Sequence, residues 1–166
     1  MPDRLAVIVL GTKKSGKSKT WNRLFNATVR SGKHQRSLYL NAAQCVDVFV
    51  ITASPQEKEM EVADLLPDPL PQIVLCSIQY HEDAASTFRY FRQNGYEQYV
   101  QWLNPGYFDS GRYDDYLGLR DLLLTKGVTL QQRSGVRHLN RRVKEIRQYI
   151  LGWTTYRNLV HTRFPT

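Results

Sequence analysis

The chain has 166 residues, 42% of them hydrophobic and 23% charged, and its formal net charge at pH 7 is +8. This length and composition suit one globular domain with its own core, which we place over residues 1–166. No apolar run approaches the roughly 18 residues of a membrane span, so the composition excludes a membrane-embedded protein.

The first predicted strand is the apolar run at residues 5–10, which follows only a short polar segment. This leaves no room for a signal peptide, so we expect a cytoplasmic protein. Two later apolar runs contain Cys45 and Cys76, which show no metal-type spacing. Both are predicted to be buried, reduced thiols.

Directly after the first strand, residues 11–18 read GTKKSGKS, and a helix is predicted to begin near Lys17 with Trp21 and Leu24 on its apolar side. Glycines at the two ends of such a turn let successive backbone amides point inward, and the helix N-terminus adds positive potential. The predicted phosphate-binding residues are Gly11, Thr12, Lys13, Lys14, Ser15, Gly16, Lys17 and Ser18. In this pattern Lys17 lies across the outer phosphates as the catalytic cation, and the Ser18 hydroxyl holds magnesium.

Two strands are predicted next, at residues 37–40 and 46–52, and the four residues 41–44 lie between them. A parallel crossover needs about a dozen residues, so this pair is expected to form an antiparallel hairpin. Ser54 is predicted to cap a helix that has Pro55 at its first position and Glu57 in a capping box. That helix is expected to run as far as residue 66, with Met60, Ala63 and Leu66 as its apolar side.

Strands and helices then alternate to the end of the chain. The predicted elements are a strand at 73–78, a helix at 83–94, a strand at 98–103, a helix at 113–126, a strand at 128–131 and a helix at about 136–151. This order predicts a three-layer α/β/α fold whose mainly parallel sheet has five or six strands and one antiparallel hairpin. Ligands then belong at the carboxyl ends of the strands, beside residues 11–18, 52–54, 79–83, 104–109 and 132–135.

The motif GTKKSGKS after a buried strand resembles the Walker A element of the P-loop NTPase superfamily, and the order of elements resembles that of the small-GTPase branch. The resemblance implies ATP or GTP bound together with Mg²⁺, with Lys17 as phosphate ligand and Ser18 as magnesium ligand. Two further motifs of that branch are absent from the chain. Residues 52–55 read TASP where the branch has D-x-x-G, and residues 104–107 read NPGY where it has N-K-x-D.

The missing aspartate leaves no apparent carboxylate to support the magnesium ion, so slow hydrolysis or binding without turnover is expected, and the base is left open. Thr52, Ser54 or Glu57 is a candidate to hold the ion through water, and helix capping is the favoured interpretation of Ser54 and Glu57.

Three other polar segments are candidates for the same rim. Residues 30–36 include the basic side chains Arg30, Lys33, His34 and Arg36. One of them could act as an arginine finger, or all of them could simply be exposed on the surface. His81, Glu82 and Asp83 could act as an acid or base at the ligand rim, or Asp83 could simply be the N-cap of the next helix. Contact with the nucleotide or an acceptor is a hypothesis for Arg133 and Arg137.

All of the excess charge lies in the last quarter of the chain, where residues 126–166 hold nine Lys and Arg and one acid, Glu145. The final helix is predicted to have an apolar face that includes Trp153 and an opposite basic face. The basic residues are Arg137, Arg141, Arg142, Lys144 and Arg147. Nucleic-acid phosphates, an acidic protein partner or solvent are the alternatives for this face.

The leading hypothesis is a nucleoside-triphosphate-binding P-loop protein that acts as a slow NTPase or a nucleotide-dependent switch with a protein partner. A small P-loop kinase that moves a phosphoryl group to a nucleoside or other small acceptor is the first alternative. A degenerate pseudo-NTPase that serves as an interaction subunit, with nucleic acid as a candidate ligand, is the second.

Overall fold

The structure is a computed structural model and describes residues 3–104 and 115–163, in which seven strands form one mixed sheet. The strands are β1 (Arg4–Gly11), β2 (Arg36–Tyr39), β3 (Gln44–Ile51), β4 (Ile73–Gln79), β5 (Tyr96–Leu103), β6 (Val128–Arg133) and β7 (His161–Thr162). The helices are α1 (Lys17–Phe25), α2 (Pro55–Lys58), α3 (Val62–Leu65), α4 (Ala84–Gln93), α5 (Leu119–Leu123) and α6 (Leu139–Tyr156).

The sheet has the order β2-β3-β4-β1-β5-β6, and β3, β4, β1, β5 and β6 pair in parallel. β2 and β3 form the antiparallel hairpin that the short connection predicted. β7, which the sequence did not predict, adds a second antiparallel pairing to β3. The α/β class and the mostly parallel sheet are therefore confirmed.

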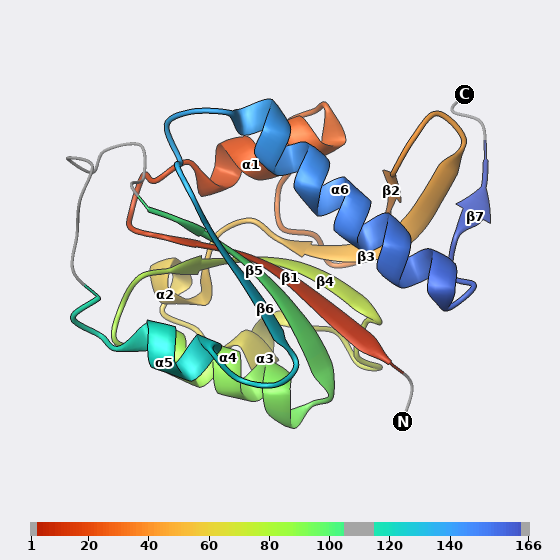
Figure 1. Cartoon of the computed structure of the whole chain (residues 1–166). Coiled ribbons are helices and arrows are strands. Elements are labelled where there is room, and N and C mark those ends of the chain that lie inside the picture. The colour runs from red at the N-terminus through yellow and green to blue at the C-terminus, as the bar shows by residue number, and fades with distance from the viewer. Residues whose placement is uncertain (1–2, 105–114, 164–166) are drawn as a thin grey trace.

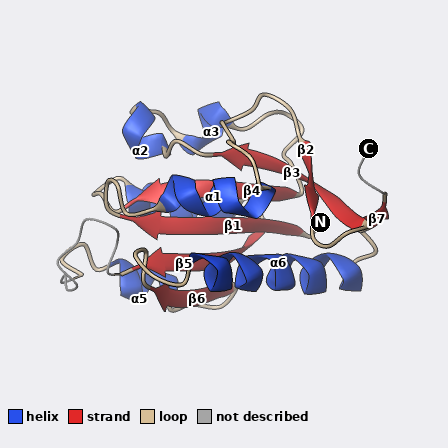
Figure 2. Cartoon of the chain, turned by 90° about the horizontal axis from the view of Figure 1, so that it is seen from above, coloured by secondary structure: helices blue, strands red, loops and turns tan. Residues whose placement is uncertain are grey.

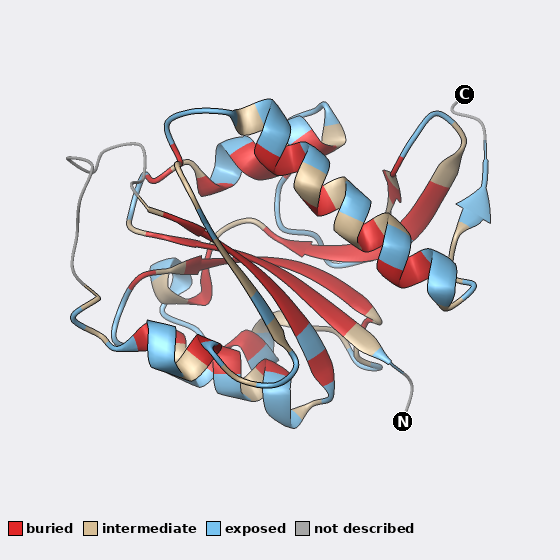
Figure 3. Cartoon of the chain, in the orientation of Figure 1, coloured by how far each residue is buried: buried red, intermediate tan, exposed pale blue. Residues whose placement is uncertain are grey.

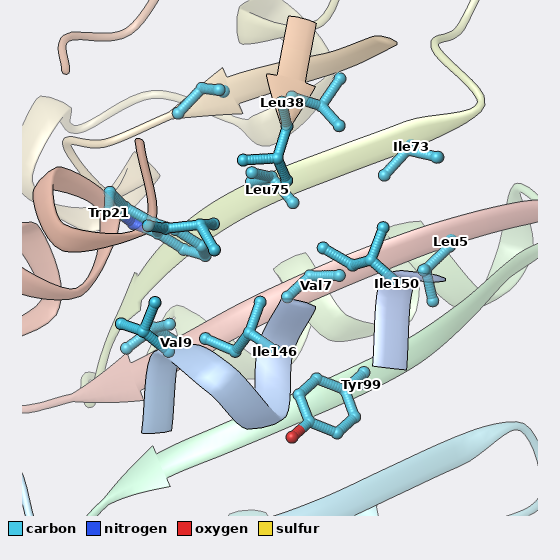
Figure 4. Close-up of a cluster of buried hydrophobic side chains, with 14 of the residues drawn as sticks. Leu5, Val7, Val9, Trp21, Leu38, Ile73, Leu75, Tyr99, Ile146 and Ile150 are labelled. Carbon is cyan, nitrogen blue, oxygen red and sulfur yellow. The ribbon is translucent and has the colours of Figure 1, made fainter. Parts of the chain in front are cut away.

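Helices cover both faces of the sheet, so the described chain has three layers (Figure 1, Figure 2). α1 and α6 lie on one face, where Trp21, Ile146 and Ile150 pack against strand residues such as Val7 and Leu75 (Figure 4). α3, α4 and α5 pack on the other face. The central strands, which both layers cover, are buried along most of their length (Figure 3).

Three predicted helices differ from the structure. The helix expected over residues 54–66 is broken into the single turns α2 and α3, because Glu59 adopts a left-handed conformation with φ 52°. Its expected apolar side is wrong at Met60, which is 42% exposed, and at Ala63, which is also exposed, whereas Leu66 packs against the core. The helix expected over 113–126 is helical only in α5, with residues 113–114 outside the described chain, and α6 begins and ends later than expected.

The parallel strands end together at one edge of the sheet. In the pairing register, Gly11 of β1 lies opposite Gln79 of β4, and Leu103 of β5 lies opposite Arg133 of β6. The polar segments at 11–18, 52–54, 79–83 and 132–135 therefore gather where the parallel topology predicted. Residues 105–109 of the predicted rim lie outside the described chain. Among residues 3–104 and 115–163, no helix has both the length and the apolarity needed to cross a membrane.

Candidate functional site

The β1–α1 connection forms a turn in which neither glycine of the motif can be replaced without a clash or strain. A Cβ on Gly11 would lie 2.2 Å from Ser15 Oγ. Gly16 has φ 104°, a left-handed conformation that glycine tolerates, and a Cβ there would lie 3.1 Å from the Gly135 carbonyl oxygen. The spacing of the two glycines is thus needed for this turn to close.

The Lys17 side chain folds back over the turn and is only 5% exposed. Its Nζ donates to the carbonyl oxygens of Gly11 at 3.2 Å and Thr12 at 2.7 Å, and it lies 3.4 Å from Ser15 Oγ. A buried ammonium group is costly unless oxygen atoms surround it. Here the loop supplies those oxygens and holds the cation at its centre.

A cavity of about 350 Å³ opens above the turn and the first residues of α1. Its lining residues are Lys14, Ser15, Gly16, Lys17, Ser18, Lys19 and Glu57. The N-terminus of α1 has no side-chain cap and no acid in its first turn, so its amides and three lysines give the cavity a positive potential. The exposed Lys13 does not line it, whereas Lys19, which the sequence did not single out, does.

The residues beside this cavity fit a magnesium ion held mostly through water. Ser18 offers a hydroxyl and Glu57 offers a carboxylate, while magnesium in proteins commonly takes one or two carboxylates, several waters and the substrate's phosphates. Within residues 3–104 and 115–163, no cluster of three or more His, Cys, Asp or Glu side chains could form an all-protein cage.

Ser54 and Thr52 are engaged elsewhere. Ser54 is fully buried, and its hydroxyl accepts the Glu57 amide at 3.1 Å, which confirms it as the α2 N-cap. Thr52 lies against Ser31, whose Oγ accepts the Thr52 amide at 2.9 Å. Of the three candidates, Glu57 is thus the one that lines the cavity.

β4 lies between β1 and β3 in the sheet, so β3, at whose end the D-x-x-G aspartate of the small-GTPase branch was expected, is not the neighbour of β1. Gln79 lies opposite Gly11, and the Tyr80 amide donates to the Gly11 carbonyl at 2.8 Å. The strand end nearest the loop therefore carries an amide side chain. The sequence could not predict this neighbour, because the short connection between β2 and β3 shows only that these two strands pair and does not give the order of the other strands.

A buried polar group that the sequence misplaced links α6 to the loop. Arg142, predicted on the exposed basic face, is 1% exposed, so that assignment is wrong. Its Nη1 donates to Thr20 Oγ1 at 2.8 Å, and the Thr20 hydroxyl donates to the Gly16 carbonyl at 3.0 Å. Gln101 Oε1 also accepts from Arg142 Nη1, at 3.3 Å, and burial lowers the pKa of Arg142 to about 10.

The segment 132–135 lies against the loop, as the rim prediction required, because the Gly135 carbonyl faces Gly16. Arg133 is held by Glu145, with its Nε 3.0 Å from Oε2, and so it is an ion-paired residue of the rim. Arg137 is exposed and lines a separate cavity. The Asn104 amide donates to the Arg133 carbonyl at 2.7 Å, and residues 105–107 lie outside the described chain.

Two other candidate segments lie away from the phosphate-loop cavity, since none of their described residues lines it. Arg36 places its guanidinium 4.8 Å from the Phe25 ring at the far end of α1, so the structure does not support it as an arginine finger. His81 and Asp83 lie at the edge of another cavity, of about 410 Å³. Asp83 occupies the N-cap position of α4 but makes no side-chain cap hydrogen bond.

The basic helix is thus less continuous than predicted. Arg137, Arg141 and Lys144 are exposed, while Arg147 donates to the carbonyls of Arg23 and Leu24 at the end of α1. Trp153 is 7% exposed and belongs to the core, as its spacing predicted.

Comparisons of the chain with protein-family models, with curated proteins and with solved structures give no match. Conclusions about function therefore rest on the geometry of the β1–α1 loop and the residues around it.

Proposed function

We propose that the chain is a P-loop protein that binds a nucleoside triphosphate with Mg²⁺ at the β1–α1 loop, hydrolyses it slowly, and acts as a nucleotide-dependent switch with a partner. The observation that carries this proposal is the position of Lys17. Its Nζ lies on the Gly11 and Thr12 carbonyls in a turn that has no room for a Cβ at Gly11. A cation held at the centre of the turn, next to the N-terminal amides of α1, suits a chain of linked phosphates.

The residues around the turn have separate tasks. The amides at the start of α1 orient the phosphate oxygens, and Lys14, Lys17 and Lys19 balance their charge. Ser18 and, through water, Glu57 hold the magnesium ion. When bound, that ion neutralises charge on the outer phosphates. Because Glu57 is the one carboxylate that lines this cavity among residues 3–104 and 115–163, we expect hydrolysis to be slow.

The second candidate function is phosphoryl transfer to a small acceptor. It is favoured by the cavity of about 410 Å³ lined by Gln56, His81 and Thr87, because α2 borders both this cavity and the one above the loop. A hydroxyl-bearing acceptor there could use His81 as a base.

Equilibrium binding of MgATP and MgGTP to the native chain, Lys17→Ala and Lys126→Ala tests the proposal. Lys126 is exposed and does not line the cavity, so its variant controls for the loss of one positive charge. Lys17→Ala is expected to weaken binding at least about tenfold, since a charge-assisted hydrogen bond is lost, while Lys126→Ala leaves it unchanged.

Product analysis separates the two candidates. Release of free phosphate without an acceptor supports the NTPase, and turnover that needs an added acceptor supports the kinase. If the native chain binds neither nucleotide, both are wrong and an interaction subunit remains.

A further inference from the structure

A second positively charged cavity lies between the end of β6 and the start of α6. Its volume is about 310 Å³, and it shares no lining residue with the cavity above the phosphate loop. The lining residues are Arg133, Ser134, Arg137, His138, Arg141, Arg142 and Glu145. Four of these are arginines and one is an acid, so the cavity favours an anion.

Arg142 gives the strongest reason to expect a ligand. Arg142 is one of the lining residues and is 1% exposed, and among the described residues its Nε has no hydrogen-bond partner. Its known contacts, Thr20 Oγ1 and Gln101 Oε1, are neutral oxygens. Glu145, the acid among the described lining residues, acts on Arg142 electrostatically but is ion-paired with Arg133, so two arginines share one carboxylate, and a buried guanidinium with incomplete compensation is costly. An anion in the cavity would supply the missing negative charge.

The backbone adds donors at the same place. α6 has 18 residues, and its N-cap residue His138 has φ 60° and makes no side-chain cap hydrogen bond. The first amides of a helix lack partners within the helix and attract anions. Just before it, Ser134 Oγ accepts the amides of Val136 and Arg137, each at 3.2 Å, and so fixes the turn that leads into α6.

We propose that this β6–α6 cavity binds a phosphate group of a second ligand, separate from the nucleotide at the β1–α1 loop. The buried Arg142, the exposed Arg137 and Arg141 and the amides at the start of α6 are its recognition groups. A free phosphorylated small molecule and a nucleic-acid backbone present the same chemistry, so both are sources to be distinguished. The proposal does not rest on the nucleotide site, because the two cavities have different residues.

The test uses the full chain with Lys17→Ala, which removes the central cation of the loop. Binding of pyrophosphate and of a single-stranded oligonucleotide is measured by thermal unfolding and by equilibrium titration. The cavity variant adds Arg137→Ala and Arg141→Ala. The control variant instead adds Lys126→Ala and Lys144→Ala, which remove two exposed cations that do not line the cavity.

We expect pyrophosphate or the oligonucleotide to raise the melting temperature of Lys17→Ala and to bind the cavity variant about tenfold more weakly, with the control variant unaffected. Pyrophosphate binding identifies a free phosphorylated ligand, and binding of the oligonucleotide alone identifies a polynucleotide. Absence of both, or equal losses in the cavity and control variants, overturns the proposal. If the native chain binds no nucleotide but the β6–α6 cavity still binds pyrophosphate or the oligonucleotide, the proposed function is wrong and the second site stands.

Discussion

The two faces of the sheet are covered in different ways. On one face lie α1 and α6, with nine and 18 residues, and Arg147 of α6 donates to carbonyls at the end of α1. On the other face lie α3, α4 and α5, with four, 10 and five residues. Both proposed phosphate sites use the N-termini of the two helices on the first face. Helix length therefore does not distinguish the faces. The first face differs because Arg147 joins its two helices and because both proposed sites lie at the N-termini of those helices, although Glu57 of α2 also lines the first cavity.

Replacing Trp21 by Ala is expected to have the largest effect on stability. Trp21 is fully buried on the α1/α6 face, and its Nε1 donates to the buried Ser77 Oγ at 2.7 Å. The variant should lose about 3–5 kcal/mol of unfolding free energy, measured by urea denaturation. Leu124→Ala, at a side chain that is 65% exposed beside α5, should change it by less than about 0.5 kcal/mol. Similar losses in both variants would contradict the position of Trp21 in the core between α1, α6 and the sheet.

Alkaline pH is expected to weaken both faces. Burial raises the pKa of Tyr99, on the α6 face, and of Tyr96, on the α4 face, to about 12 from the model-compound value of 10.0. Between these two values the unfolded chain loses the phenol protons and the folded chain keeps them, so unfolding free energy falls as pH rises from about 10 to about 12.

Urea midpoints measured across this pH range check the expectation. Tyr99→Phe and Tyr96→Phe should each make the fall less steep, since each removes one titrating phenol. An unchanged slope in one variant would show that the tyrosine on that face keeps an ordinary pKa.

The smallest predicted effect concerns the cap that holds Glu57 beside the phosphate-loop cavity. Ser54→Ala removes the hydroxyl that accepts the Glu57 amide, which should cost about 1 kcal/mol of unfolding free energy. Thr28→Ala, at an exposed position, is the control and should cost less than about 0.5 kcal/mol. Magnesium-dependent nucleotide binding should also weaken in Ser54→Ala, and an unchanged magnesium dependence would argue against Glu57 as a ligand.

Local patterns predicted most of the fold. Buried strands such as residues 73–78 have continuous apolar runs, and the stop of α4 at Gly95 follows from the positive φ that glycine allows. The pattern at 54–66 misled because two turns of apolar spacing do not require a continuous helix when Glu59 adopts a left-handed conformation. The helical spacing of α6 predicted that Arg142 is one of the exposed cations. This prediction was wrong because Thr20 and Gln101, which are far from Arg142 in the sequence, accept hydrogen bonds from its buried guanidinium.

The motif at residues 11–18 could be found from sequence because its residues are adjacent in the chain. Its surroundings could not, since Gly135 and Glu57 are distant in the chain and approach the loop only in the folded sheet.

The Thr20 hydroxyl has one consequence for regulation. It donates to the Gly16 carbonyl and accepts from Arg142, so one side chain joins the turn at the phosphate loop to a recognition group of the second cavity. Any free energy by which a ligand in one cavity changes binding in the other must act equally in the reverse direction. If a nucleotide at the phosphate loop changes the affinity of the β6–α6 cavity for its ligand, that ligand must change the affinity for the nucleotide by the same factor. The chain would then respond reciprocally to two phosphorylated ligands.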